Sequence, residues 1–232
     1  MTGDRPDDEA FDPAESLRLI REQQDRARTA TEPDGRLLYL AWGVAWLAGY
    51  LCLWVSSREQ GDGSQPEPWA FAVFGGAIIA AVAFTIVHSV SRTAGTRGVS
   101  ARTGALYGWS WMLGFLTLGL VLGGLARAGA SDEVMSLASN AFACVVVGLL
   151  YLGGSAAFQD TRLFVLGVWI LLVAAVATFA GLPHTYLVMA LLGGGGFLVM
   201  AAIEHLLGAR RRRRALDGPR TLRGRSPEVA DA

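Results

Sequence analysis

The feature that most constrains this chain is a series of six long apolar segments, of which Leu37–Val55 is the first. That segment has 19 residues and no charge, and Arg36 and Arg58 flank it. A bilayer core is about 30 Å thick and a helix rises about 1.5 Å per residue, so roughly 20 apolar residues cross it. A soluble protein can bury one such helix. Six in series within 232 residues indicate a polytopic membrane protein.

The other five segments lie at about 69–90, 105–125, 134–157, 163–180 and 186–207. We therefore predict an all-α fold whose six-helix transmembrane domain covers residues 37–207. An acidic and amphipathic cytoplasmic segment, residues 1–36, precedes it. A basic tail, residues 208–232, follows it and is predicted to be disordered and cytoplasmic, with the arginine run 210–214 ending the last helix.

Within the N-terminal segment, residues 1–12 are acidic and predicted to be disordered. Pro13 can open a helix, with Asp12 as its cap, that continues to about Arg28 as a short amphipathic helix. Two interpretations stay open for it. The helix either lies on anionic head groups or is solvated in the cytoplasm. The polar start of the chain lacks the apolar core of a cleavable signal peptide.

The orientation follows from the arginines, because cytoplasmic loops carry an excess of basic residues. All 20 basic residues are arginine. If the N-terminus is cytoplasmic, 18 of them lie inside and only Arg58 and Arg127 lie outside. Both termini are therefore predicted to be cytoplasmic. The absence of lysine and the many alanines and glycines are typical of high-GC bacterial genomes, which places the chain in a bacterial plasma membrane.

An arginine precedes each inside-to-outside span, and a tryptophan follows near its start. Arg36 precedes Trp42 and Trp46, and Arg162 precedes Trp169. The pattern would fit three copies of a helical hairpin. The positive-inside rule and interfacial tryptophans also produce such a pattern, so both explanations stay open.

Several glycines have spacings that allow helix backbones to approach closely. Gly104/Gly108 and Gly119/Gly123 lie four apart in the third span, where we expect packing within the chain rather than a dimer seam. Four consecutive glycines, Gly193, Gly194, Gly195 and Gly196, lie near the middle of the sixth span. They predict either a packing groove, which we favour, or a broken helix around a transported solute.

Glu204 is the only acidic residue inside a predicted span, with His205 beside it and His88 at the same depth in the second span. Intramembrane ionisable groups are candidates for function. Because Glu204 lies six residues before Arg210, we expect it to reach the interface or to pair with a loop arginine. The three side chains lack a metal-binding spacing such as His-Glu-x-x-His, so we expect no metal or other cofactor.

The basic cluster after the sixth span is a candidate lipid-binding segment as well as a stop-transfer signal. It comprises Arg210, Arg211, Arg212, Arg213 and Arg214. No aromatic platform or folded module accompanies it, so nucleic acid is not an expected partner. Cys52 and Cys144 both lie inside apolar spans and are interpreted as small packing residues.

Asp12–Leu17, Leu38-Tyr39 and Trp42–Gly49 resemble the start of uncharacterised multi-pass membrane proteins of high-GC bacteria. The resemblance implies membrane partners of small regulators or transport systems and brings no known activity.

The loops are too short for a soluble catalytic domain, and no catalytic constellation is visible in the spans. We therefore expect a non-enzymatic accessory, sensory or scaffolding protein, with a protein partner or a homo-oligomer as its assembly. The alternative is a small-solute transporter or permease component. Transport needs inward polar groups, and the spans offer few of them. The main ones are Thr85, Ser110, Thr117, Ser139 and Asn140.

Overall fold

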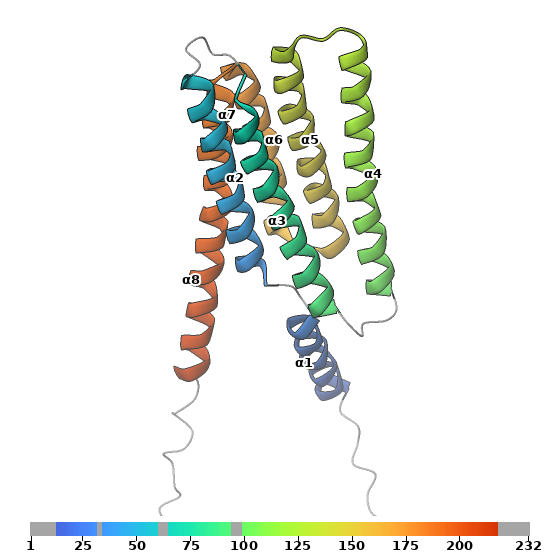
Figure 1. Cartoon of the computed structure of the whole chain (residues 1–232). Helices are drawn as coiled ribbons and strands as arrows, with labels where there is room; N and C mark the ends of the chain where they lie inside the picture. The colour runs from blue at the N-terminus through green and yellow to red at the C-terminus, as the bar shows by residue number, and fades with distance from the viewer. Residues whose placement is uncertain (1–12, 32–33, 60–64, 94–98, 218–232) are drawn as a thin grey trace, which may run out of the picture.

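The computed structural model describes residues 13–31, 34–59, 65–93 and 99–217. Within these ranges the chain is helical, and six helices are long and apolar enough to span a membrane. Figure 1 shows them as one bundle, with α1 and the end of α8 projecting from the same end. The predicted all-α polytopic fold is therefore confirmed.

The helix that precedes the bundle is α1 (Pro13–Thr31). The first five spans are α2 (Gly35–Glu59), α3 (Pro68–Thr93), α4 (Val99–Arg127), α5 (Asp132–Phe158) and α6 (Thr161–Ala180). The sixth is one continuous helix in three parts: α7 (His184–Val188), a π-helical turn η1 (Met189–Gly194) and α8 (Gly195–Asp217). Each predicted span lies inside one of these helices.

Polar residues in the short turns fix where the middle helices begin. The Ser131 hydroxyl accepts a hydrogen bond from the Val134 N–H at 3.3 Å and caps α5. The Asp160 carboxylate accepts from the Arg162 N–H at 2.9 Å and caps α6. Such caps satisfy N–H groups that have no partner inside the first helical turn. At the other end of α6, Gly181 has a φ of 65°, which favours glycine over other residues.

The core lies between α2, α5, α6 and the sixth span. Its largest fully buried side chains include Leu53, Ile170, Tyr186 and Phe197. Trp46 packs edge-on against both Tyr50 and Phe197, with ring centroids 5.7 and 5.4 Å apart. Trp46 of the first span therefore packs against the sixth span.

The spans α3 and α4 lie at the edges of the bundle. Within the described residues α3 packs mainly on α2, and α4 packs on α5. None of residues 101–127 is buried, and large side chains such as Met112 and Leu120 are two-thirds exposed. In a membrane protein this apolar surface is the natural face for lipid.

The expectation that the α4 glycines pack within the chain is wrong. A Cβ added at Gly104, Gly108, Gly119 or Gly123 would meet no atom of the described residues within 4 Å. The reason is rotational: α4 turns another face towards α5. There Tyr107 contacts Phe158, and Gly114 lies against Val146.

The first two hairpins of the suggested repeat, α2–α3 and α4–α5, share a glycine contact between their two helices. Gly49 lies against Phe74 of α3 and Gly114 against Val146 of α5, so each glycine joins the two helices of its own hairpin. The third hairpin differs, because Gly167 of α6 lies against Gly148 of the preceding hairpin. The structure thus supports a correspondence between two of the three units.

The sixth span continues further than predicted. Residues 208–217 are helical, so the arginine run does not end the helix as expected from the sequence. Arginine, alanine and leucine are good helix formers, and charge stops insertion into a membrane without breaking helical hydrogen bonds. Residues 1–12 and 218–232, for which disorder is predicted, lie outside the described residues, as does the cap Asp12.

Candidate functional site

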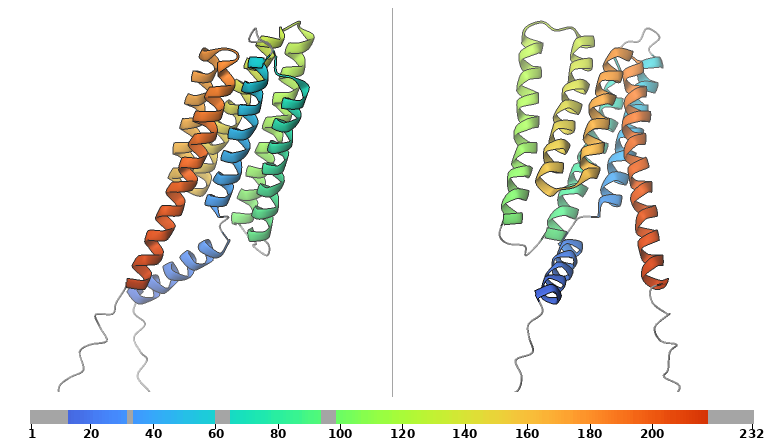
Figure 2. Two further views of the ribbon diagram at one scale, coloured as in Figure 1. Left: turned by 60° about the vertical axis from the view of Figure 1, so that its left-hand side comes forward. Right: turned by 180° about the vertical axis from the view of Figure 1, so that it is seen from behind.

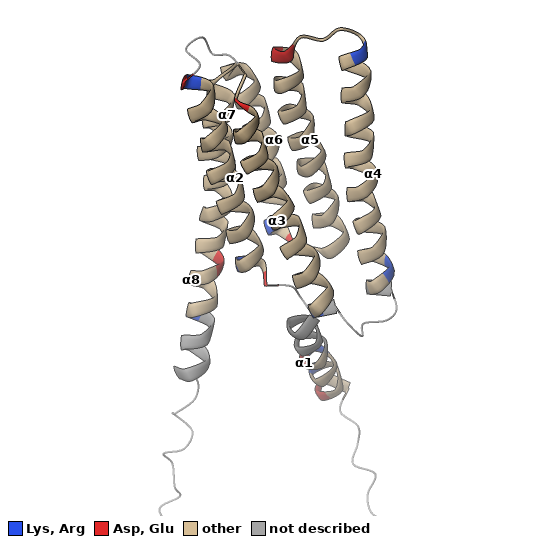
Figure 3. Ribbon diagram, in the orientation of Figure 1, with Lys and Arg blue, Asp and Glu red and all other residues tan. Residues whose placement is uncertain are grey.

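Charged residues of the described chain gather at the two ends of the bundle (Figure 3). At the end that carries α1, four charged residues and one histidine connect the spans to one another. We call this set the polar layer: Asp34, Arg36, His88, Arg162 and Glu204. It is the candidate site, and the arginine distribution predicts that it faces the cytoplasm.

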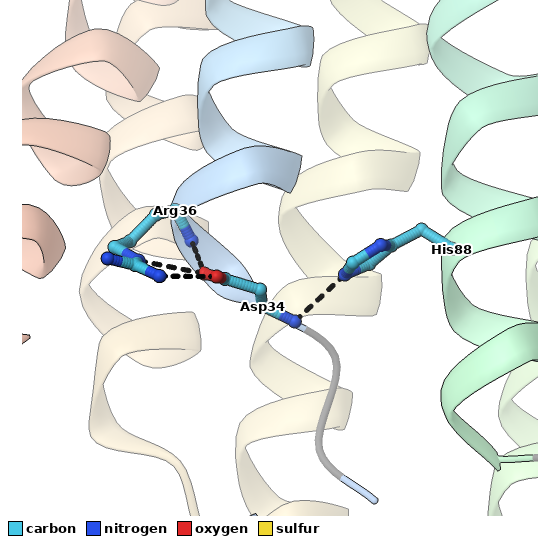
Figure 4. A network of polar contacts seen from close by, with 3 residues as sticks. All are labelled: Asp34, Arg36 and His88. Carbon is cyan, nitrogen blue, oxygen red and sulfur yellow. Dashed lines mark hydrogen bonds and ion pairs between the residues drawn. The ribbon is translucent and has the colours of Figure 1, made fainter.

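Asp34 and Arg36 form the first half of the polar layer (Figure 4). The Arg36 guanidinium donates two hydrogen bonds to the Asp34 carboxylate, from Nε at 3.0 Å and from Nη2 at 2.6 Å. The Arg36 backbone N–H donates a third, at 3.1 Å. Charge-assisted, paired hydrogen bonds are the strong kind. They hold the pKa of Asp34 below its ordinary value of 3.8, against a smaller opposing effect of burial.

His88 joins α3 to this pair. Its Nε2 accepts a hydrogen bond from the Asp34 backbone N–H at 3.0 Å, which requires Nε2 to be unprotonated. The imidazole also stacks on Phe84 of the same helix, with ring centroids 5.6 Å apart. His88 is thus a hydrogen-bond acceptor that fixes the start of α2 against the end of α3.

Glu204 and Arg162 form the second half of the polar layer. Arg162 Nη1 lies 2.7 Å from Glu204 Oε1 and connects α6 to α8. The N–H does not point at the carboxylate oxygen, so the contact is an ion pair rather than a hydrogen bond. The Glu204 side chain is only 13% exposed. The prediction that Glu204 pairs with a loop arginine is borne out by this contact.

Arg36 links the two halves. It interacts electrostatically with Glu204 as well as with Asp34. It also lies against α8, because a Cβ added at Gly208 would be 3.9 Å from Arg36 Nη1. The polar layer therefore runs from α3 through α2 and α8 to α6, and joins four spans at one end of the bundle.

The trio of Glu204, His205 and His88 does not form one site. His88 binds Asp34, Glu204 binds Arg162, and His205 is exposed beside them. Among the described residues no group of three His, Cys, Asp or Glu side chains could hold a metal ion. Sequence reasoning missed Asp34, Arg36 and Arg162 as members of the site. The predicted topology could have indicated them, because it places the turns 33–35 and 159–162 on the same side of the membrane as Glu204.

The glycine run of the sixth span meets other helices. A Cβ at Gly193 would lie 2.7 Å from the Trp46 ring, and one at Gly194 would lie 2.6 Å from the backbone N of Leu47. One at Gly196 would collide with Nε1 of Trp169. Only Gly195 faces open space. Three of the four glycines therefore give room to side chains or backbone of α2 and α6.

The π-helical turn η1 includes Gly193 and Gly194, and it does not break the span. The Gly195 N–H bonds the carbonyls of Ala190 and Leu192, and the Trp169 indole donates to the same Leu192 carbonyl at 2.9 Å. A π turn widens the helix locally and often occurs at functional sites. Here the turn provides an acceptor that holds α6 to the sixth span.

The few polar side chains inside the spans are largely used in packing. Trp42 donates to Thr85 at 3.0 Å, and Tyr50 donates to Asn140 at 2.7 Å, so both pairs connect different helices. Ser110 and Ser139 bond carbonyls of their own helices. Cys144 is buried against Met189, and both cysteines are free thiols.

Comparison of the chain with protein-family models, curated proteins and solved structures found no match.

Proposed function

We propose that this chain is a non-enzymatic scaffolding or accessory protein of a bacterial plasma membrane, whose working surface is its predicted cytoplasmic end. The observation that carries the proposal is the concentration of polar structure there. The polar layer ties four spans together at that end. Two helical extensions, α1 and the last turns of α8, project beyond it (Figure 2).

The interior supports the same proposal. The glycine run is occupied by Trp46, Leu47 and Trp169, so the position suggested for a solute site is a helix-packing contact. A packed interior with a polar, extended end suits a protein that binds a partner at the membrane surface. The polar layer would hold the helices that carry this surface in one arrangement.

In vivo photo-crosslinking tests this function. A photoreactive amino acid is placed at Arg18 on α1 or at Arg210 on α8, both of which are exposed. The matched control position is Ser131, an exposed residue in the turn at the opposite end of the bundle. We expect Arg18 and Arg210 to crosslink one common cytoplasmic protein and Ser131 not to do so.

The membrane location of the crosslinked partner must also depend on this chain. In a strain that lacks the gene, the crosslinked protein should leave the membrane fraction, and the wild-type gene should restore it. Crosslinks of equal yield from both ends, or a partner whose location is unchanged in the deletion strain, would contradict the scaffolding function.

A small-solute transporter is the second candidate, and the π turn η1 is the observation that favours it. Single cysteines at positions 193–196, with Cys52 and Cys144 replaced by alanine, separate the two candidates. In a scaffold these positions should resist water-soluble thiol reagents. Ready labelling at two or more of them, together with solute uptake into proteoliposomes that Glu204→Gln abolishes, would favour transport instead.

A further inference from the structure

Helix α1 divides lengthwise into an uncharged half and a charged half. At about 100° per residue, Ala30 and the uncharged residues between 16 and 27 fall within one half of the helix circumference, and the seven charged residues between 15 and 28 fall within the other, together with Ala14 and Thr29. The uncharged set is Ser16, Leu17, Leu19, Ile20, Gln23, Gln24, Ala27 and Ala30. The charged set is Glu15, Arg18, Arg21, Glu22, Asp25, Arg26 and Arg28.

The bundle does not cover the large side chains of the uncharged half. Leu17, Leu19 and Ile20 are 53%, 49% and 52% exposed. Figure 2 shows why: α1 lies outside the bundle and approaches it at the end of α3, with which it makes its main contacts among the described elements. Three adjacent large apolar side chains on a helix this polar need a surface to cover them.

The position of α1 in the chain places that surface close by. Only residues 32–34 separate the end of α1 at Thr31 from the start of the first span at Gly35. Four residue steps span at most about 14 Å. The C-terminal end of α1 is therefore held near the plane where α2 enters the membrane. Near the same end of α3, the apolar side chains of Val87 and Val90 are exposed.

The order of charges around α1 favours lipid over a soluble partner. By the same helical spacing, Arg21 and Arg28 border the uncharged half on one side, and Arg26 borders it on the other with Glu15 next to it. Asp25 and Glu22 fall nearer the middle of the charged half, and Glu22 pairs with Arg18 at 3.7 Å on the solvent side. Arginines at the border can extend to anionic phosphates while Glu22 and Asp25 stay in water.

We infer that α1 lies along the inner membrane surface, with its uncharged half in the head-group region of anionic lipids and its charged half towards the cytoplasm. This inference does not depend on the proposed function. It assigns the apolar residues 17, 19 and 20 to lipid contact. It leaves the charged half as the face available to other molecules.

Spin-label accessibility in the full-length, reconstituted protein tests the inference. The four variants Leu17→Cys, Ile20→Cys, Arg18→Cys and Glu22→Cys are made in a chain with Cys52→Ala and Cys144→Ala. The vesicles contain phosphatidylglycerol and phosphatidylcholine, with pure phosphatidylcholine as the neutral comparison. The measurement is the ratio of label collisions with oxygen, which concentrates in lipid, to collisions with a water-soluble nickel chelate.

We expect the oxygen-to-nickel ratio in the anionic vesicles to be several-fold higher at positions 17 and 20 than at the matched positions 18 and 22. The difference should decrease in the neutral vesicles, because the bordering arginines lose their anionic partners. Equal access of nickel to all four positions would overturn the inference. So would spin–spin broadening at 17 and 20 that grows with the protein-to-lipid ratio, since it would mean that a second copy covers this face.

Discussion

Two neighbouring glycines of the sixth span should respond oppositely to the same substitution. Gly194→Ala places a methyl group 2.6 Å from the backbone N and 2.9 Å from the Cα of Leu47. These are backbone atoms, so α2 and η1 must move apart to make room. Gly195→Ala places the same methyl group in open space.

The size of the effect follows from two terms. Forcing extra atoms into a packed contact costs about 1–3 kcal/mol. Replacing a helical glycine by alanine gains up to about 1 kcal/mol, and this gain applies to both variants because both positions have helical backbone angles. The difference between the two free energies of unfolding therefore isolates the collision with α2. We expect Gly194→Ala to be less stable than Gly195→Ala by about 1–3 kcal/mol.

Reversible unfolding in mixed detergent micelles, followed by tryptophan fluorescence, measures this difference. Trimming the Leu47 side chain should not rescue Gly194→Ala, because the colliding atoms belong to the backbone. The reasoning would be refuted if Gly194→Ala were as stable as Gly195→Ala or more stable. Such a result would mean that the sixth span does not pack closely on α2 at this point.

Four further outcomes follow from the structure. Arg162→Gln should lower the free energy of unfolding by about 1–3 kcal/mol, because it leaves the mostly buried Glu204 without its counter-ion. The stability difference between wild type and Asp34→Asn, measured as a shift in melting temperature, should be complete above pH 3.8 and shrink as pH falls below it. The sign follows because a carboxylate whose pKa is lowered by folding stabilises the fold when ionised. Replacing Arg210–Arg214 with glutamine should weaken binding to anionic vesicles by on the order of 1 kcal/mol per arginine, and less at high salt; a loss independent of salt would instead indicate a protein partner. A reporter active only outside the cytoplasm should work when inserted at Gly129 and fail at the C-terminus, and the reverse result would overturn the predicted orientation.

The amino-acid sequence by itself determined the number of spans and their approximate limits. These depend on a local property, an apolar run long enough to cross the bilayer. It also indicated that Glu204 needs a partner, because a carboxylate within a span is costly to leave alone. The same local reasoning failed at the arginine run, where charge was interpreted as the end of the helix as well as the end of the span.

Only the tertiary structure decided which residues meet. Gly194 and Gly195 are identical neighbours in the sequence, yet a Cβ at Gly194 would meet α2, and one at Gly195 would meet none of the described residues within 4 Å. The α4 glycines have the spacing of a packing motif and still face away from α5. Asp34 forms a hydrogen bond with His88, which is 54 residues away in the sequence. Glu204 forms its ion pair with Arg162. Each outcome depends on how a helix is rotated and shifted against its neighbours. That arrangement results from all the contacts of the bundle together, so no single segment of sequence contains it.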